Sequence, residues 1–182
     1  MIRLKSLLSE ITQDDIVTKL LEKIRNKEFE RIGAGDNGIV YRILGEDYVF
    51  KITRERDEFE LASVIVGRYS EFTTFVPVLY VNSAENMYIM QNASDLPVRL
   101  KREIDLFVER FTKFALDADN EVSIFDYLDS DGARETDTQL VNFLRTLQRD
   151  VERTGITEMD LDLDFKSDNV MIFNGNIVLV DW

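Results

Sequence analysis

Asp164, Asn169 and Asp181 have side chains whose types and spacing suit metal binding and the orientation of a hydroxyl group. Asn169 follows Asp164 by five positions, and two short apolar, β-rich runs separate Asn169 from Asp181. The runs are joined by Asn174-Gly175-Asn176, and Asn-Gly between such runs is the strongest short-range signal of a β-hairpin. A hairpin here would bring Asn169 and Asp181 together, and their oxygens are hard ligands suited to Mg²⁺. Asp164 then remains to orient a hydroxyl group, although the same residue types also occur in ordinary loops and turns.

A glycine-rich stretch early in the sequence could lie against phosphate groups. Gly33, Gly35 and Gly38 follow the pattern G-x-G-x-x-G, and Val40 stands two residues beyond the last glycine. Dinucleotide-binding oxidoreductases share this pattern, but their glycine loop leads from a strand into a helix. Here residues 39–44 are mostly β-branched, aromatic and aliphatic, which favours a strand. The stretch therefore predicts two strands joined by a glycine loop, whose backbone can approach phosphates closely.

Lys51 lies in the next predicted strand, residues 48–52, between two apolar neighbours. A lysine in such a strand needs a phosphate, a carboxylate or solvent as its partner. The following segment, residues 54–69, has apolar side chains at helical spacing. Glu58 shares the inner face of that helix, so it is the predicted partner of Lys51, with Glu60 as the second choice. The other acidic residues of the helix fit an ordinary solvated surface.

Over residues 29–182 the sequence resembles the protein-kinase-like superfamily, because the same features follow one another in the same order. These are the glycine loop, the strand lysine, the helix glutamate, D-x-x-x-x-N and the strand-ending Asp. The resemblance implies that ATP and Mg²⁺ are bound, that Lys51 holds the α- and β-phosphates, and that Met90 guards the back of an adenine pocket. It implies catalytic residues Asp164, Lys51 and Glu58; nucleotide-binding residues Gly33, Gly35, Gly38, Val40, Lys51, Met90, Gln91 and Ala93; and metal-binding residues Asn169 and Asp181. A methionine at a strand end is otherwise an ordinary core residue.

The resemblance also implies an α+β, two-lobe fold. A five-stranded antiparallel N-lobe, residues 29–91, would precede a reduced helical C-lobe, residues 92–182, that ends at the D-F-G-equivalent position. Residues 1–28 are interpreted as an amphipathic helical segment packed on the first lobe. Further strands are predicted at 75–81 and 87–90, helices at 98–116 and 138–153, and a loop with one short helix at 117–134.

Departures from the superfamily's pattern leave two functions open. Asp162-Leu163 stand where the superfamily has His-Arg, Asp181-Trp182 stand at D-F-G, and the sequence has no activation segment on which a peptide substrate would rest. The first hypothesis is a minimal Mg-ATP-dependent phosphotransferase that moves the γ-phosphoryl group to a hydroxyl-bearing protein or small-molecule acceptor. The alternative is a pseudokinase or nucleotide-gated protein-interaction module without catalysis. With either function, a partner protein or self-association would complete the missing C-lobe.

The composition excludes several other classes. The 182 residues include 22 basic and 35 acidic side chains, for a net charge of −13, which opposes binding to nucleic acid or to an anionic membrane. Without cysteine or histidine, disulfides, thiolate metal sites and Ser-His-Asp chemistry are ruled out. No run reaches transmembrane length and the N-terminus lacks a signal-peptide core, so an intracellular, cytoplasmic location is expected. Residues 7–10, Leu-Leu-Ser-Glu, are similar to sites cut by the head-maturation proteases of tailed phages, which would suggest a phage-encoded protein in a host cytoplasm or virion.

Overall fold

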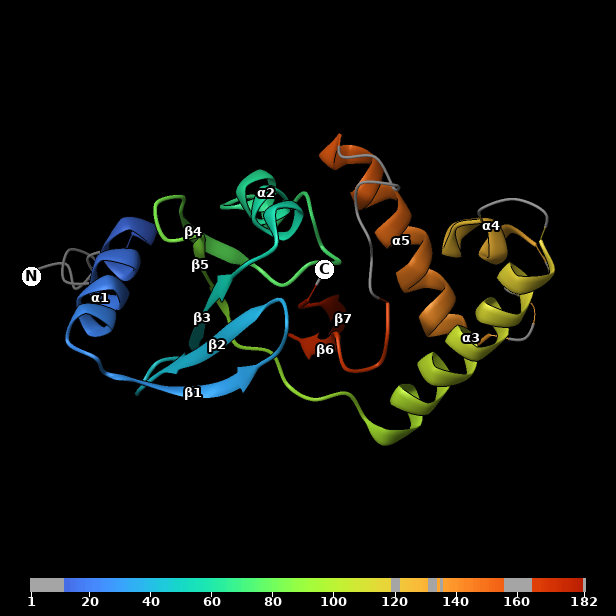
Figure 1. Ribbon diagram of the computed structural model, residues 1–182, viewed down its shortest axis with the longest axis horizontal. Coiled ribbons are helices and arrows are strands. Elements are labelled where there is room, and N and C mark those ends of the chain that lie inside the picture. The colour runs from blue at the N-terminus through green and yellow to red at the C-terminus, as the bar shows by residue number, and fades with distance from the viewer. Residues whose placement is uncertain (1–11, 119–121, 131–133, 135, 156–164, 182) are drawn as a thin grey trace, which may run out of the picture.

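The fold combines a five-stranded antiparallel sheet, several helices and a separate β-hairpin (Figure 1). The computed structural model describes residues 12–118, 122–130, 134, 136–155 and 165–181. The order of strands in the sheet is β1-β2-β3-β5-β4. Its strands are β1 (Phe29–Ala34), β2 (Gly38–Ile43), β3 (Tyr48–Thr53), β4 (Val78–Asn82) and β5 (Met87–Gln91), and the hairpin consists of β6 (Val170–Phe173) and β7 (Asn176–Leu179). The predicted α+β class and five-stranded antiparallel sheet are confirmed.

Helices cover both faces of this sheet. The described helices are α1 (Gln13–Arg25), α2 (Arg56–Ile65), α3 (Val98–Asp117), α4 (Ile124–Asp129) and α5 (Thr138–Thr154). On one face, α1 contributes the fully buried Leu20 to a small apolar cluster. The other face packs against α2 and continues into a larger cluster with α3, α4, α5 and the hairpin. Val40, Lys51 and Tyr88 pair across three adjacent strands, so their side chains share this second face.

The hairpin lies between the sheet and α5 (Figure 1). Asn174 and Gly175 form its turn with φ values of 49° and 82°, the left-handed backbone that a two-residue type I′ turn requires. The predicted Asn-Gly hairpin is therefore present. A parallel bridge joins Phe75 to Leu179 of β7, and an antiparallel bridge joins Ser94 to β6. These two bridges attach the hairpin to the segments that flank β4 and β5.

Two predicted elements are shorter than expected. Within 75–81 the strand begins only at Val78, because Phe75 pairs with Leu179 of the hairpin instead. The predicted helix 54–69 ends at Ile65, since Gly67 turns the chain with a φ of 72° and its N–H donates to the Val78 carbonyl. Both differences arise from contacts distant in sequence.

Within the predicted loop 117–134, the short helix is α4. Ser123 and Asp126 form a capping box at its start, which satisfies backbone donors that the first helical turn leaves unpaired. Residues 1–11, including the segment that is similar to phage protease sites, lie outside the described residues. None of the described helices has the length and apolar character needed to cross a membrane.

Candidate active site

Lys51 is the centre of a buried charge cluster in the middle of the sheet. Its strand, β3, is flanked by β2 and β5, and its side chain lies between those of Val40 and Tyr88. Only 3% of the lysine is exposed. Its Nζ donates to the Glu58 carboxylate and, at 2.6 Å, to Asp181 Oδ1. Helix α2 and the segment after β7 thus each present one carboxylate to the same ammonium group.

Three side chains donate hydrogen bonds to the Glu58 carboxylate, which is 2% exposed. Besides Lys51, the Thr53 hydroxyl donates to Oε2 and the Tyr88 hydroxyl donates to Oε1 at 2.6 Å. Burial raises the pKa of Glu58, although Lys51 and the two hydroxyls act in the opposite direction. Burial, and then the Glu58 charge, raise the pKa of Tyr88 well above its ordinary value. Glu60, the second choice from the sequence, instead pairs with an exposed arginine of its own helix.

Asp181 leaves the hairpin close to Asn169. The Val180 N–H donates to the Asn169 carbonyl at 2.9 Å, which fixes the residue just before Asp181. Asn169 is only 6% exposed, whereas 41% of the Asp181 side chain is exposed. The hairpin therefore brings Asn169 and Asp181 together, and the Asp181 carboxylate contacts Lys51 on one side while it remains open to solvent.

The glycine loop forms the turn between β1 and β2. The Gly35 N–H donates to the Gly38 carbonyl at 3.0 Å, and the Arg54 N–H donates to the Asn37 carbonyl at 2.8 Å. A Cβ added at Gly38 would lie 2.4 Å from the Ile52 carbonyl oxygen, so the close approach of β3 requires glycine there. A Cβ at Gly35 would have no neighbour within 4 Å among the described residues. Gly35 therefore lies on an open side of the turn.

The remaining predicted nucleotide-binding residues follow the sheet from β1 to the end of β5. Gly33 pairs with Val40, and Val40 pairs with Lys51, so these three residues lie in a row across β1, β2 and β3. Met90 is 5% exposed and belongs to the larger apolar cluster. Just beyond it, the Gln91 N–H donates to a carbonyl of the segment before β4, whereas the Ala93 N–H makes no hydrogen bond with another described residue.

Asp164 and Trp182 lie outside the described residues. The residue after Asp164, Phe165, is 7% exposed, and its ring centroid is 6.1 Å from that of Phe107 and 6.2 Å from that of Phe143. Aromatic side chains of α3 and α5 therefore fix the chain immediately after the predicted catalytic aspartate.

Thr53 and Tyr88 belong to the site but were not predicted from the sequence. A signal for both exists in the strand pattern. Thr53 stands two positions after Lys51 and so points to the same face, and Tyr88 lies directly opposite Lys51 in β5. The first relation can be read from the sequence, whereas the second depends on the register of the strands.

The cluster of Lys51, Glu58 and Asp181 combines one positive with two negative side chains and is therefore able to attract a cation. Among the described residues, no group of three or more acidic, histidine or cysteine side chains is placed to hold a metal ion. A cation beside Asp181 would consequently need further ligands, such as the Asn169 amide, phosphate oxygens or water. A cavity of about 670 Å³ lies elsewhere, between the Thr73–Thr74 segment, α5 and the turn of the hairpin, and none of the predicted site residues lines it.

Neither a family model nor a curated protein sequence matches the chain. Among solved structures, a choline/ethanolamine kinase family protein from Mesorhizobium loti is similar, with 17% identity and a TM-score of 0.42 over 94% of this chain. The chain spans 65% of the length of that protein. The aminoglycoside phosphotransferase APH(4)-Ia has 16% identity and a TM-score of 0.40, over 94% of this chain and 71% of its own. A streptomycin-ATP complex of APH(2")-IIa has 16% identity and a TM-score of 0.36, over 93% of this chain and 70% of its own. None of these similarities supports a phage origin. In structure, the chain is therefore similar to a choline/ethanolamine kinase family protein and to aminoglycoside phosphotransferases.

Proposed function

We propose that this chain is a Mg-ATP-dependent phosphotransferase that transfers the γ-phosphoryl group of ATP to a hydroxyl group of an acceptor. The observation that carries the proposal is the buried Lys51, which bonds to carboxylates from two separate elements beside a glycine turn. In this position the ammonium group and the backbone of the turn can hold phosphates. Glu58 orients the lysine, and Asp181 contributes to the metal site.

A purely structural role explains this cluster less well. A buried ion pair is a weak source of stability because desolvation of the charges offsets their attraction, and here a second carboxylate shares the same ammonium. Lys51 is almost inaccessible, whereas Asp181 is partly exposed, so the excess negative charge lies on the open side. A bound cation would compensate this charge, and phosphate groups would compete with Asp181 for Lys51.

The oxygen atoms of Asn169 and Asp181 fit a magnesium site. Proteins commonly bind Mg²⁺ through one or two carboxylates together with substrate phosphates and water, so a three-carboxylate cluster is not required. The contact with Lys51 uses Oδ1 of Asp181, which leaves Oδ2 as a ligand. A bound magnesium ion would neutralise charge on the phosphate oxygens, while Asn169 and Asp181 would orient the triphosphate along the glycine turn.

The adenine and acceptor sites are proposed from the positions of nearby residues. The backbone of Gln91 and Ala93 follows β5, where the Ala93 N–H can donate to the base, and the buried Met90 closes the back of that pocket. Asp164 directly precedes the fixed ring of Phe165 and would align the acceptor hydroxyl and accept its proton. The acceptor is a hydroxyl-bearing protein or small molecule.

Lys51→Met tests the site that this proposal requires. Methionine keeps most of the length of the side chain but removes the ammonium group, so the triphosphate loses charge-assisted hydrogen bonds. Mg-ATP affinity, measured by isothermal titration calorimetry, should weaken by about 1.5–3 kcal/mol. Lys113→Met is the matched control because Lys113 is exposed and pairs with Glu109 of its own helix; this variant should bind like the parent.

Equal Mg-ATP affinity in the parent and in folded Lys51→Met would contradict the proposed site. Release or transfer of labelled γ-phosphoryl groups by the parent then separates the two candidate functions. Binding with turnover is the result expected of a phosphotransferase. Mg-ATP binding without turnover, in the presence of small-molecule and protein hydroxyl acceptors, would instead favour the nucleotide-gated interaction module.

A further inference from the structure

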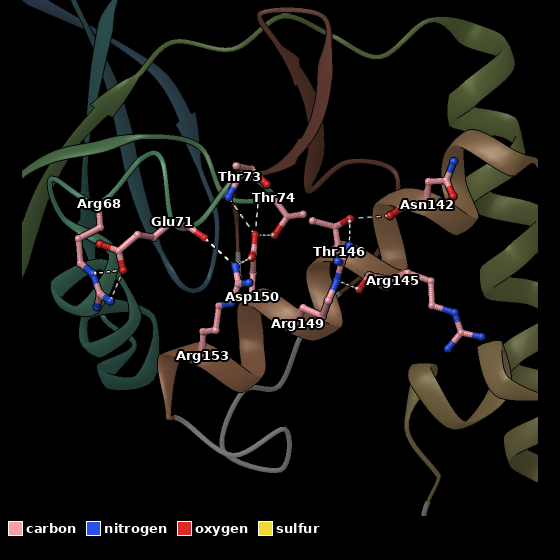
Figure 2. A network of polar contacts seen from close by, with 10 residues as sticks. All are labelled: Arg68, Glu71, Thr73, Thr74, Asn142, Arg145, Thr146, Arg149, Asp150 and Arg153. Carbon is pink, nitrogen blue, oxygen red and sulfur yellow. Dashed lines mark hydrogen bonds and ion pairs between the residues drawn. The ribbon is translucent and has the colours of Figure 1, made fainter.

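Asp150 is a buried carboxylate that the proposed phosphoryl transfer does not use. It lies near the end of α5 and is 1% exposed. Its Oδ2 accepts hydrogen bonds from the Thr73 N–H at 2.9 Å, the Thr74 N–H at 3.0 Å and the Thr74 hydroxyl at 2.8 Å (Figure 2). Its Oδ1 lies 3.6 Å from Nη1 of Arg153, whose side chain is largely exposed. Three donors at one oxygen therefore compensate most of this buried charge.

The loop that Asp150 holds is also bonded to the strand that leads to Asp181. The Leu179 N–H donates to the Thr74 carbonyl at 2.7 Å, and the Val76 N–H donates to the Leu179 carbonyl at 3.0 Å. Leu179 is fully buried. A continuous series of hydrogen bonds thus runs from α5, through this loop, to the residue two positions before Asp181.

The same loop connects α2, which carries Glu58, to β4. Its first part is fixed where the Gly67 N–H donates to the Val78 carbonyl at 3.0 Å, and its second part is fixed by Asp150. A shift of the loop would therefore move two partners of Lys51, because α2 precedes the loop and β7 pairs with it.

We propose that Asp150 is a positioning residue whose carboxylate fixes the loop of residues 73–76 and thereby sets the place of Asp181 relative to Lys51. The effect of Asp150 on the binding of Mg-ATP rests on the proposed function, whereas its effect on the position of β7 follows from the geometry alone. A carboxylate suits this role because a single oxygen can accept several hydrogen bonds. An apolar side chain would leave the backbone N–H groups of Thr73 and of the buried Thr74 without their acceptor.

Three variants separate positioning from a general loss of stability. Because all three donors meet at one oxygen, Asp150→Asn can keep an acceptor there, whereas Asp150→Leu cannot. Thr74→Val removes one donor with little change of shape and provides a second test if Asp150→Leu does not fold. Leu20→Ala is the control, since it weakens the apolar cluster on the opposite face of the sheet.

Two measurements report on the network. Amide hydrogen exchange at Leu179 and Val180 reports on β7 without any ligand, and the Mg²⁺ dependence of ATP binding, followed by calorimetry, reports on the metal site. Asp150→Leu and Thr74→Val should speed exchange at these two amides relative to amides of β2 and β3. Asp150→Leu should also raise the Mg²⁺ concentration for half-maximal ATP binding about tenfold. Asp150→Asn should restore most of both properties.

In Leu20→Ala, exchange should quicken across the sheet while the Mg²⁺ requirement of the folded protein stays that of the parent. Unchanged relative exchange at Leu179 and Val180 in Thr74→Val and in any folded Asp150→Leu would overturn the positioning role. Faster exchange with an unchanged Mg²⁺ requirement would overturn the link to Asp181. A parent that binds no Mg-ATP would overturn the proposed function, and the exchange measurement would still decide whether Asp150 positions β7.

Discussion

At the scale of single residues, burial of Glu58 and its hydrogen bonds shift the pKa of this carboxyl group in opposite directions. Burial raises the pKa of its carboxyl group, whereas Lys51, Thr53 and Tyr88 favour the charged form. Burial has the largest effect, so the net direction is upward. The folded protein therefore binds this proton more tightly than the unfolded chain does. As a result, the contribution of Glu58 to stability falls as pH rises from about 4.3, the ordinary glutamate pKa, through the raised value.

Glu58→Gln should remove this pH-dependent contribution, because the amide keeps the shape of the side chain but cannot ionise. The free energy of unfolding of the parent, relative to that of the variant, should decrease as pH rises above about 4.3. Urea denaturation over a series of pH values measures this difference. Glu60→Gln, on the exposed part of the same helix, should show no comparable trend. A difference that is constant with pH, or that increases with pH, would contradict the raised pKa.

Residues of the site differ in how far the sequence predicts their contacts. The pairing of Lys51 with Glu58 follows from local patterns, since an apolar strand and a helical face each place one of the two charges inside. Tyr88 does not follow from such patterns, because strand register decides which side chain lies opposite Lys51. Asp150 lies 77 positions from Thr73, and no local period links a helix to a loop so distant in sequence.

At the scale of elements, two glycines of the β1–β2 turn are required for different reasons. An alanine Cβ at Gly38 would meet backbone atoms of β3, with 2.4 Å to the Ile52 carbonyl oxygen and 3.1 Å to the Thr53 Cα. Backbone atoms of a central strand can move little, so the turn and the strand of Lys51 would have to separate. At Gly35 the added Cβ would meet no described atom within 4 Å, and this open side is where the proposed phosphates lie.

Gly38→Ala should therefore mainly lower stability, whereas Gly35→Ala should mainly weaken the binding of Mg-ATP. Gly38→Ala should lower the free energy of unfolding by about 1–3 kcal/mol, as overpacking commonly does. Gly35→Ala should change it by less than about 0.5 kcal/mol yet weaken Mg-ATP binding, because its methyl group occupies the space proposed for phosphate. Urea denaturation and calorimetry measure the two effects. Full Mg-ATP affinity in Gly35→Ala would place the phosphates away from this turn.

Most elements could be predicted because their local sequence signals are clear. The β-branched and aromatic residues of 39–44 and 48–52, the Asn-Gly turn and the apolar spacing in 98–116 each indicate one structure, and the observed elements agree closely. The start of β4 could not be predicted, because Phe75 continues the apolar run but pairs with Leu179. The competing partner is distant in sequence, so only the tertiary structure decides between strand and bridge.

At the scale of the whole molecule, charge opposes a free nucleotide both at long range and locally. The chain has a net charge of −13, which repels polyanions in solution. In the site itself, the single ammonium group of Lys51 is already shared by Glu58 and Asp181. Metal-free ATP therefore meets an unfavourable field during approach and a lysine that is already paired with two carboxylates on arrival, whereas Mg²⁺ lowers the charge of the nucleotide and can bind Asp181.

ATP in EDTA should consequently bind weakly, and its affinity should rise when KCl is added. Salt shortens the Debye length from about 10 Å at 0.1 M to about 3 Å at 1 M, which screens the repulsion between the nucleotide and the acidic protein. In Mg²⁺ the affinity should be much higher and should depend less on KCl, because coordination at Asp181 acts at contact distance. Calorimetric titrations with ATP over a series of KCl concentrations, in either EDTA or Mg²⁺, measure both trends. Adenosine is the control because it is uncharged, so its affinity for the base pocket should not depend on salt. Tight binding in EDTA that falls steeply with KCl would reveal a positive site for the triphosphate, and would contradict a site built from one shared lysine and a metal ion.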